Sequence, residues 1–249
     1  MPPRELLREN WDQAVLTKHG GIVLLASGHF ASWHSSEPGT VRRLVSPAGI
    51  VQLARAASSA VALDQTDHLW LVRDHGTEAI KPLWKGCRWL YDSQQEGKAL
   101  ARLHTGELIV LDVDTASARV ISLPVGGTSQ AALASDGTLW IMAGGLWCMR
   151  KGSETWEAIL KVRADQIHPF ADSILLLSEG LIAANTGLRV PKLKQTQLLI
   201  TSADLAAAMH FQAKITIWAS FDPEGHQVVK AHPAARQMAL SSSGLLLTW

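Results

Sequence analysis

Two pairs of side chains in this 249-residue chain have types and spacing that could do chemistry. His29 and His34 could bind a metal, but five positions along a strand place them on opposite faces, so a bend would have to bring them together. Asp112 and Asp114 share a strand face, as two carboxylates would for acid–base catalysis or calcium binding. Their sequence context, Asp-Val-Asp-Thr-Ala-Ser, more simply predicts a turn in which the Asp side chains cap backbone amides. We favour the turn.

A third cluster, Asp74 and His75, could form a catalytic dyad with a serine. The chain has no Gly-x-Ser-x-Gly elbow, and the serines at 58, 59 and 241–243 stand in turn contexts. A solvated loop after a strand is the favoured interpretation. No glycine-rich phosphate loop followed by Lys-Ser or Lys-Thr occurs. The sequence therefore predicts a protein that is not an enzyme, with no cofactor and no metal.

The charge balance limits the classes of partner. There are 23 Lys and Arg residues against 22 Asp and Glu, a formal charge of +1, whereas nucleic-acid surfaces carry a clear basic excess. The same balance argues against electrostatic attachment to anionic lipid. We therefore expect no nucleic acid and no membrane among the partners.

The cysteines and the apolar runs suggest a compartment. Cys87 and Cys148 stand in apolar company, and two buried thiols in a reduced compartment are favoured over a single disulfide. Residues 1–10 lack the apolar core of a secretion signal, and no apolar run approaches the roughly 18 residues of a membrane span. These features predict a cytoplasmic protein.

The elements that must position these side chains follow a repeat. The clearest unit, residues 131–142, has an apolar strand, a turn at Ser-Asp-Gly and a second apolar strand. Asp-Gly between two such runs is a strong hairpin signal, because glycine tolerates positive φ at the turn. Further strands are expected at 146–149 and 156–160, which makes four strands in about thirty residues.

The same pattern recurs around turns near positions 20, 67, 106, 137, 180, 213 and 244, with a mean spacing of about 37 residues. It predicts an all-β chain that forms a single β-propeller domain over residues 1–249. We expect seven blades of mainly four-stranded antiparallel sheets, with six as the alternative count. Because the last unit stops after two strands, residues 3–12 are expected to supply its outer strands. The ring would then be closed by N- and C-terminal strands, which leaves no raw edge.

The run Ser-Asp-Gly-Thr-Leu-Trp-Ile at 135–141, followed by Gly-Gly-Leu-Trp at 144–147, resembles two kinds of propeller repeat. Two-component-regulator sensors and tectonin-type lectins both use an Asp-Gly-x-Leu-Trp hairpin. Residues 67–70 are a fair second match, whereas the WD-repeat signature is absent. The resemblance implies a fold and not an activity, since propellers host many functions.

The chain has ten tryptophans, which divide into two groups. Trp70, Trp140, Trp218 and Trp249 occupy what we take to be one slot, in the second strand of their units, and are expected to pack between sheets. Other tryptophans and nearby arginines could form a recognition face, because Trp and Arg dominate binding hot spots. Core packing is the competing interpretation for each of these candidate binding residues, which are Trp33, Trp84, Arg88, Trp89, Trp147, Arg150 and Trp156.

Three functions remain open. The leading hypothesis is a non-enzymatic intracellular scaffold or adaptor for protein–protein interaction, as a subunit of a bacterial multiprotein system. It rests on the lack of a recognisable set of catalytic residues in a fold that offers a broad rigid surface. The first alternative is a carbohydrate-binding, tectonin-like lectin, suggested by the tryptophan content. The second is an enzyme whose site lies at the mouth of the central channel.

Overall fold

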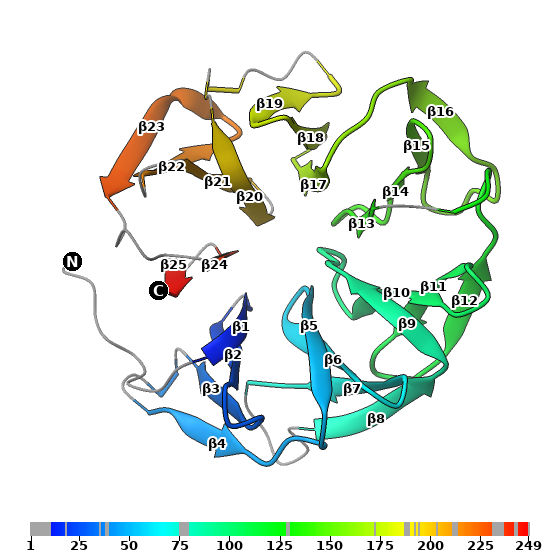
Figure 1. The fold of residues 1–249 in the computed structure, drawn as a ribbon, viewed down its shortest axis with the longest axis vertical. Coiled ribbons are helices and arrows are strands. Elements are labelled where there is room, and N and C mark those ends of the chain that lie inside the picture. Colours follow the sequence, from blue (N-terminus) through cyan, green and yellow to red (C-terminus); the bar gives the residue numbers. More distant parts are fainter. Residues whose placement is uncertain are drawn as a thin grey trace.

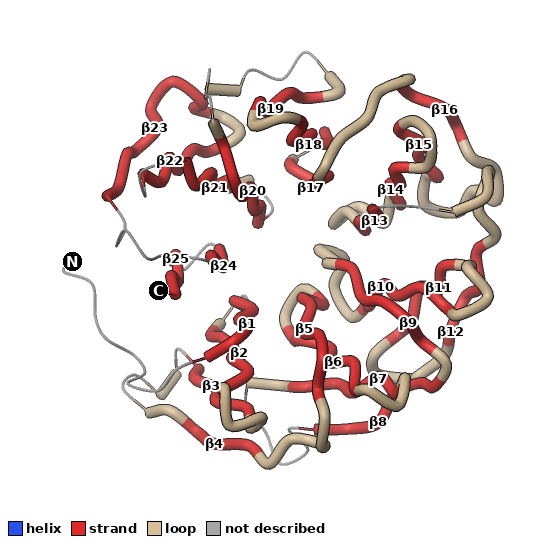
Figure 2. The backbone as a smooth tube through the Cα atoms, in the orientation of Figure 1, coloured by secondary structure: helices blue, strands red, loops and turns tan. Residues whose placement is uncertain are grey.

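A computed structural model describes residues 11–17, 19–34, 36–37, 40–74, 80–127, 130–171, 173–186, 190–191, 193, 195–202, 204–210, 214–230, 237–241 and 244–248. Across this part of the chain the regular structure consists of β-strands joined by turns (Figure 2). Among these residues there is no helix with the length and apolar character needed to cross a membrane.

Six antiparallel sheets stand around a central axis as the blades of a β-propeller (Figure 1). Blades 1 and 2 are β1 (Trp11–Leu16), β2 (Gly20–Leu25), β3 (Phe30–His34) and β4 (Arg42–Leu44), then β5 (Ile50–Ala56), β6 (Ser59–Asp64), β7 (His68–Val72) and β8 (Ile80–Lys85). Blades 3 and 4 are β9 (Cys87–Tyr91), β10 (Lys98–Leu103), β11 (Leu108–Asp112) and β12 (Ala118–Ile121), then β13 (Gln130–Leu133), β14 (Leu139–Met142), β15 (Leu146–Met149) and β16 (Glu157–Leu160). Blades 5 and 6 are β17 (Gln166–Phe170), β18 (Ser173–Ser178) and β19 (Leu181–Ala184), then β20 (Thr196–Ser202), β21 (Leu205–His210), β22 (Lys214–Ala219) and β23 (Asp222–Lys230).

The prediction of an all-β single propeller is confirmed, but the prediction of seven blades is wrong. After the six blades comes only a two-stranded hairpin, β24 (Gln237–Ser241) and β25 (Gly244–Thr248), and β24 packs beside β20 and β1. Counting turns gave seven because a hairpin needs only two strands, whereas a blade needs the outer strands as well.

The predicted ring closure is also corrected. Trp11 and Asp12 belong to β1, which pairs with β2 in blade 1 and not with the C-terminal hairpin. Residues 1–10, the rest of the segment expected to complete the last sheet, lie outside the described residues. In the described residues the C-terminal hairpin therefore meets blade 1 by side-by-side packing of β24 and β1.

The two faces of the ring follow from strand direction. Ser93, just after β9, forms parallel bridges with Ala56 of β5 and Leu133 of β13, so these first, innermost strands run the same way. The turns that join first to second strands, and third to fourth strands, therefore lie on one face, which we call the upper face. The turns that join second to third strands, and the connections between blades, lie on the lower face.

These assignments correct the tryptophan slot expected from the sequence. Trp140 lies on a second strand, β14, whereas Trp70 and Trp218 lie on third strands, β7 and β22. Trp249 falls outside the described residues. Any antiparallel hairpin shows an apolar run, a turn and an apolar run, so this pattern alone does not tell which two strands of a blade it joins.

The core lies between neighbouring blades. Strands β2 and β6 are buried along their whole length, because both faces of an inner sheet region pack on a neighbour. One cluster joins Leu69 and Leu71 of blade 2 to Ile109 and Leu111 of blade 3. The two cysteines are free and buried, as the interpretation as two thiols predicted.

Candidate functional site

The histidine pair does not come together. His29 is exposed in the turn before β3, and His34 lies at the far end of that strand, where its Nδ1 is 2.6 Å from Ser36 Oγ. Within the described ranges, no group of three or more His, Cys, Asp or Glu side chains is placed to hold a metal ion. The structure thus offers no positive support there for metal chemistry.

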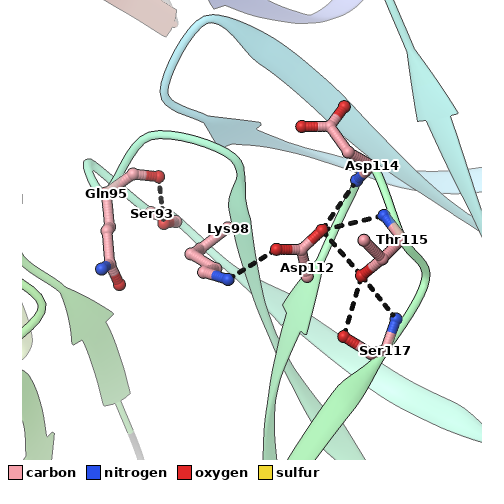
Figure 3. A network of polar contacts seen from close by, with 7 residues as sticks. All are labelled: Ser93, Gln95, Lys98, Asp112, Asp114, Thr115 and Ser117. Carbon is pink, nitrogen blue, oxygen red and sulfur yellow. Dashed lines mark hydrogen bonds and ion pairs between the residues drawn. The ribbon is translucent and has the colours of Figure 1, made fainter. Parts of the chain in front are cut away.

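The aspartate pair forms a turn, as the favoured interpretation predicted. Asp112 accepts hydrogen bonds from the backbone N–H groups of Asp114 (3.1 Å) and Thr115 (2.9 Å), and its other oxygen accepts one from Lys98 Nζ at 2.7 Å (Figure 3). The bond from Lys98, followed by those from Thr115, holds the pKa of Asp112 well below its usual range. Asp114 turns away and pairs with Arg73 of blade 2 at 2.9 Å.

Asp74 is not in a solvated loop, and that interpretation is wrong. Asp74 is 3% exposed, and one of its carboxylate oxygens accepts a hydrogen bond from Thr17 Oγ1 at 2.7 Å. Ser32 Oγ donates to its backbone carbonyl at 3.3 Å. Asp74 therefore ties blade 2 to blade 1. His75 lies outside the described residues.

The central channel gathers polar groups from four blades. The backbone N–H of Arg55 in β5 donates to Asp92 Oδ1 at 3.0 Å, and its side-chain Nη2 donates to the Thr201 carbonyl at 2.8 Å. Gln94 Nε2 donates to the Pro169 carbonyl (2.9 Å) and to Thr201 Oγ1 (3.1 Å). These bonds join residues 37 to 146 positions apart in sequence, so the channel groups hold the ring together.

His168 lies close to this cluster. Burial, only partly opposed by Asp92 and reinforced by Arg55, lowers the pKa of His168 to about 4, so its imidazole is neutral at pH 7. A neutral imidazole could serve as a base. However, its Nε2 lies 3.2 Å from Gln166 Oε1, and among the described residues no serine or cysteine is hydrogen-bonded to it.

Glutamines on the inner strands recur as ties between blades. Gln13 of β1 accepts from Leu53 N (2.6 Å) and donates to the Val51 carbonyl (3.1 Å) of β5. Gln52 of β5 exchanges two bonds of 2.9 Å with the backbone N–H and carbonyl of Leu90 in β9. Since the side-chain amide carries both a donor and an acceptor, it pairs with an inner strand as another backbone would.

The same position continues around the ring. Gln166 of β17 accepts from Leu199 N of β20 at 3.3 Å, and Gln130 and Gln237 begin β13 and β24. Sequence analysis missed this recurrence, although a glutamine directly before an apolar residue is visible at each of these positions in the sequence. In blades 3 and 6 the position is occupied by Trp89 and Leu198, so these two blades lack the amide there.

Three of the predicted binding residues are half-buried and pack against core clusters. Trp33 packs beside Gly21, where an added Cβ would come within 2.4 Å of its ring, so this glycine is required by the close approach. Trp147 and Trp156 pack against the cluster between blades 3 and 4, and their ring N–H groups donate to the carbonyls of Ala143 (3.1 Å) and Ser122 (2.8 Å). For these three, core packing is the better interpretation.

The other four predicted residues are exposed. Trp89 is 54% exposed and lines a 260 Å³ hollow of the central channel together with Gln52 and Gln130. Trp84, on the outer strand of blade 2, is 37% exposed, and Arg88 is exposed beside Trp89. Arg150 lies on the upper face, away from these three, with its Nε 3.7 Å from Glu157 Oε2. The structure thus places part of the predicted set on one face and separates the rest.

Exposed apolar side chains form an arc on the lower side of blades 2 and 3. They stand at the lower ends of strands or in connections between blades, and we call them the lower-face arc: Val45, Val51, Trp84, Trp89 and Val125. Two of them, Val51 and Trp89, lie in the neighbouring inner strands β5 and β9. Large exposed apolar groups gathered on one side of a protein mark interaction surfaces.

The fold and these surfaces define a β-propeller, and the comparison with solved structures supports that class. PorZ, a surface component of the type-IX secretion system of Porphyromonas gingivalis, superposes with a TM-score of 0.65 at 14% identity, over 96% of this chain and 35% of that one. This chain therefore spans about a third of PorZ. The WD40 repeats of RRP9 give a TM-score of 0.67 at 13% identity, over 97% and 87% of the two chains.

A third similar structure is Prp20p from Saccharomyces cerevisiae, with a TM-score of 0.64 at 10% identity, over 91% of this chain and 79% of that one. At such identities the likeness establishes the fold alone. No protein-family model matches the chain, and no curated protein matches it by sequence. The expected propeller repeat fold is confirmed, whereas the two-component-regulator or tectonin type stays a prediction.

Proposed function

We propose that this protein is a non-enzymatic scaffold that binds another protein through the lower-face arc, with Trp89 at its centre. One observation carries the proposal. At the inner-strand position where Gln13, Gln52 and Gln166 tie neighbouring blades together, blade 3 instead holds a tryptophan that is 54% exposed. A tryptophan that is exposed, and that makes none of the inter-blade bonds of these glutamines, is best explained by a role in binding.

The energetics agree with a hot spot. Covering the exposed half of the Trp89 side chain would remove roughly 120 Å² of mainly apolar surface from water, worth about 3 kcal/mol. Arg88 beside it adds a second residue type that is enriched in hot spots. Val45, Val51 and Val125 add further exposed apolar surface on the same side of the ring.

The structural neighbours support a macromolecular partner. PorZ is described as a secretion-system component, and Prp20p is described as binding Gsp1p and histones. The proposal for this chain includes membership of a multiprotein assembly and the cytoplasmic location expected from the sequence.

The test is an affinity purification from the source organism with three proteins. The wild type should recover a stoichiometric protein partner. Trp89→Gln should bind that partner about 100-fold more weakly, because about 3 kcal/mol of burial is lost. The matched control is Phe221→Gln, which removes an 85% exposed aromatic from an upper-face turn and should bind like the wild type.

Equal recovery by wild type and Trp89→Gln would contradict the proposal. So would a glycan array in which sugars bind and Trp89→Gln abolishes that binding, because the same side chain would then serve as a lectin platform.

A further inference from the structure

A pocket of about 300 Å³ opens on the upper face between blades 3 and 4. Blade 3 contributes Lys98 of β10 together with residues at the two ends of the turn between β11 and β12, and blade 4 contributes the turn after β15. This volume lies at the low end of ligand pockets, so it suits a side chain or a short segment and not a dinucleotide.

The floor of the pocket is apolar. Val110 of β11 and Ile121 of β12 face Leu133, Leu139 and Met149 of blade 4 across the gap. None of the lining residues is aromatic, so there is no platform on which a nucleic-acid base could stack. An apolar group would gain by entering this space.

The rim is cationic. Its charged lining residues are Lys98, Arg119, Arg150 and Lys151 against one carboxylate, that of Asp112. Lys98 is already neutralised by Asp112 at 2.7 Å, and Arg150 lies 3.7 Å from Glu157. Arg119 donates from Nη2 to the Ser153 carbonyl at 2.8 Å, a neutral partner, and no carboxylate of the described residues forms an ion pair with it. In a chain with a formal charge of +1, this is a local excess.

The wall of the rim is held in place before any ligand arrives. Asp112 is fixed by the bonds from Lys98 and Thr115, and Thr115 Oγ1 is 2.8 Å from Ser117 Oγ at the start of β12 (Figure 3). Arg119 bridges from blade 3 to the loop of blade 4. Preorganised groups cost less conformational entropy on binding.

We propose that this pocket binds an acidic peptide segment that inserts one large apolar side chain between blades 3 and 4, with its carboxylates against Arg119 and Lys151. A phosphate ligand fits less well, since phosphate sites are built from converging backbone N–H groups, and this rim consists of side chains. The pocket is on the face opposite the lower-face arc, so this second recognition site does not rest on the proposed function.

The test uses fluorescein-labelled octapeptides with four Asp or Glu residues around a central Leu, Phe or Met, read by fluorescence anisotropy. Binding should weaken strongly when the acids become Asn or Gln, when the central residue becomes Ser, and when salt is raised. Lys151→Glu should weaken binding roughly tenfold, because it reverses one rim charge. Val110→Phe should weaken it as much by filling the floor.

Matched controls separate these effects from general ones. Lys161→Glu reverses an exposed charge outside the pocket, and Val120→Phe enlarges a 52% exposed valine on β12 that does not line it. Both should bind peptide like the wild type, as should Trp89→Gln, which tests the other face.

Three results would overturn the inference: no acidic peptide binding with a Kd below about 1 mM, a Kd unchanged within twofold in both Lys151→Glu and Val110→Phe, or equal competition by inorganic phosphate or an oligonucleotide.

Discussion

Replacing Gln52 with methionine tests the ties that join the inner strands. Methionine has nearly the same length, so it keeps the contacts of the side-chain stem while it removes both bonds of 2.9 Å to Leu90. Each intramolecular hydrogen bond contributes a net 0.5–1.5 kcal/mol, roughly. Losing two, with the Leu90 N–H and carbonyl left facing the channel, should cost about 1–3 kcal/mol of unfolding free energy.

The assay is equilibrium unfolding in urea together with a thermal scan. For a chain of this size about 1 kcal/mol shifts Tm by roughly 2–4 °C, so Gln52→Met should lower Tm by about 2–12 °C. Gln227→Met, on the exposed outer strand β23, is the control and should stay within about 0.5 kcal/mol of the wild type. A Gln52→Met variant as stable as this control would refute the role assigned to the inner-strand glutamines.

Three further predictions concern titrating groups. Burial lowers the pKa of His168 to about 4, below its unfolded value near 6.5, so stability should be full above about pH 6.5 and fall as the pH drops toward 4. In a plot of Tm against pH, His168→Asn should show a smaller fall in Tm over this pH range than the wild type. An equal fall in both proteins would contradict the lowered pKa of His168. The pKa of Asp112 is depressed, so its contribution should be present above about pH 4 and disappear at lower pH. Asp112→Asn should reduce the loss of stability at acid pH, whereas the control Glu154→Gln should leave that loss unchanged. Burial, followed by the effect of Asp67, raises the pKa of Cys87 to about 12, so Cys87 and Cys148 should resist a disulfide reagent at pH 8 until guanidinium unfolds the protein. Rapid labelling of the native protein would show that the thiols are accessible.

Local patterns were enough to predict much of the fold. The hairpin at residues 131–142 was predicted from alternating apolar runs around Asp-Gly, and β13 and β14 pair there in register from Gln130 to Leu133. The turn at Asp112 was predicted from the tendency of Asp side chains to bond nearby amides, and the structure confirms it. Such features depend on interactions within a few residues of the chain.

The features that depend on distant segments were not predictable in the same way. The blade count failed because a hairpin motif does not reveal whether outer strands accompany it. Asp74 follows a strand as a loop residue would, yet its carboxylate is buried because Thr17, 57 positions away, donates to it. The inner-strand glutamines bond to residues 33 to 40 positions away, so their role appears only once the blades are side by side.

The pockets needed the same long-range information. Of the predicted binding residues, Trp33, Trp147 and Trp156 are half-buried against core clusters, whereas Trp89 is exposed at the channel, and sequence context did not separate the two groups. A tryptophan in a place where neighbouring repeats have glutamine would have been the distinguishing signal.

The most direct test of the account is the unfolding free energy of Trp89→Gln, measured by urea denaturation. If the tryptophan is a surface residue that replaces a structural glutamine, the new amide can face the backbone of β13, and the variant should be as stable as the wild type or more stable. A loss of 2 kcal/mol or more, of the size roughly expected when a well-packed large side chain is removed, would contradict it.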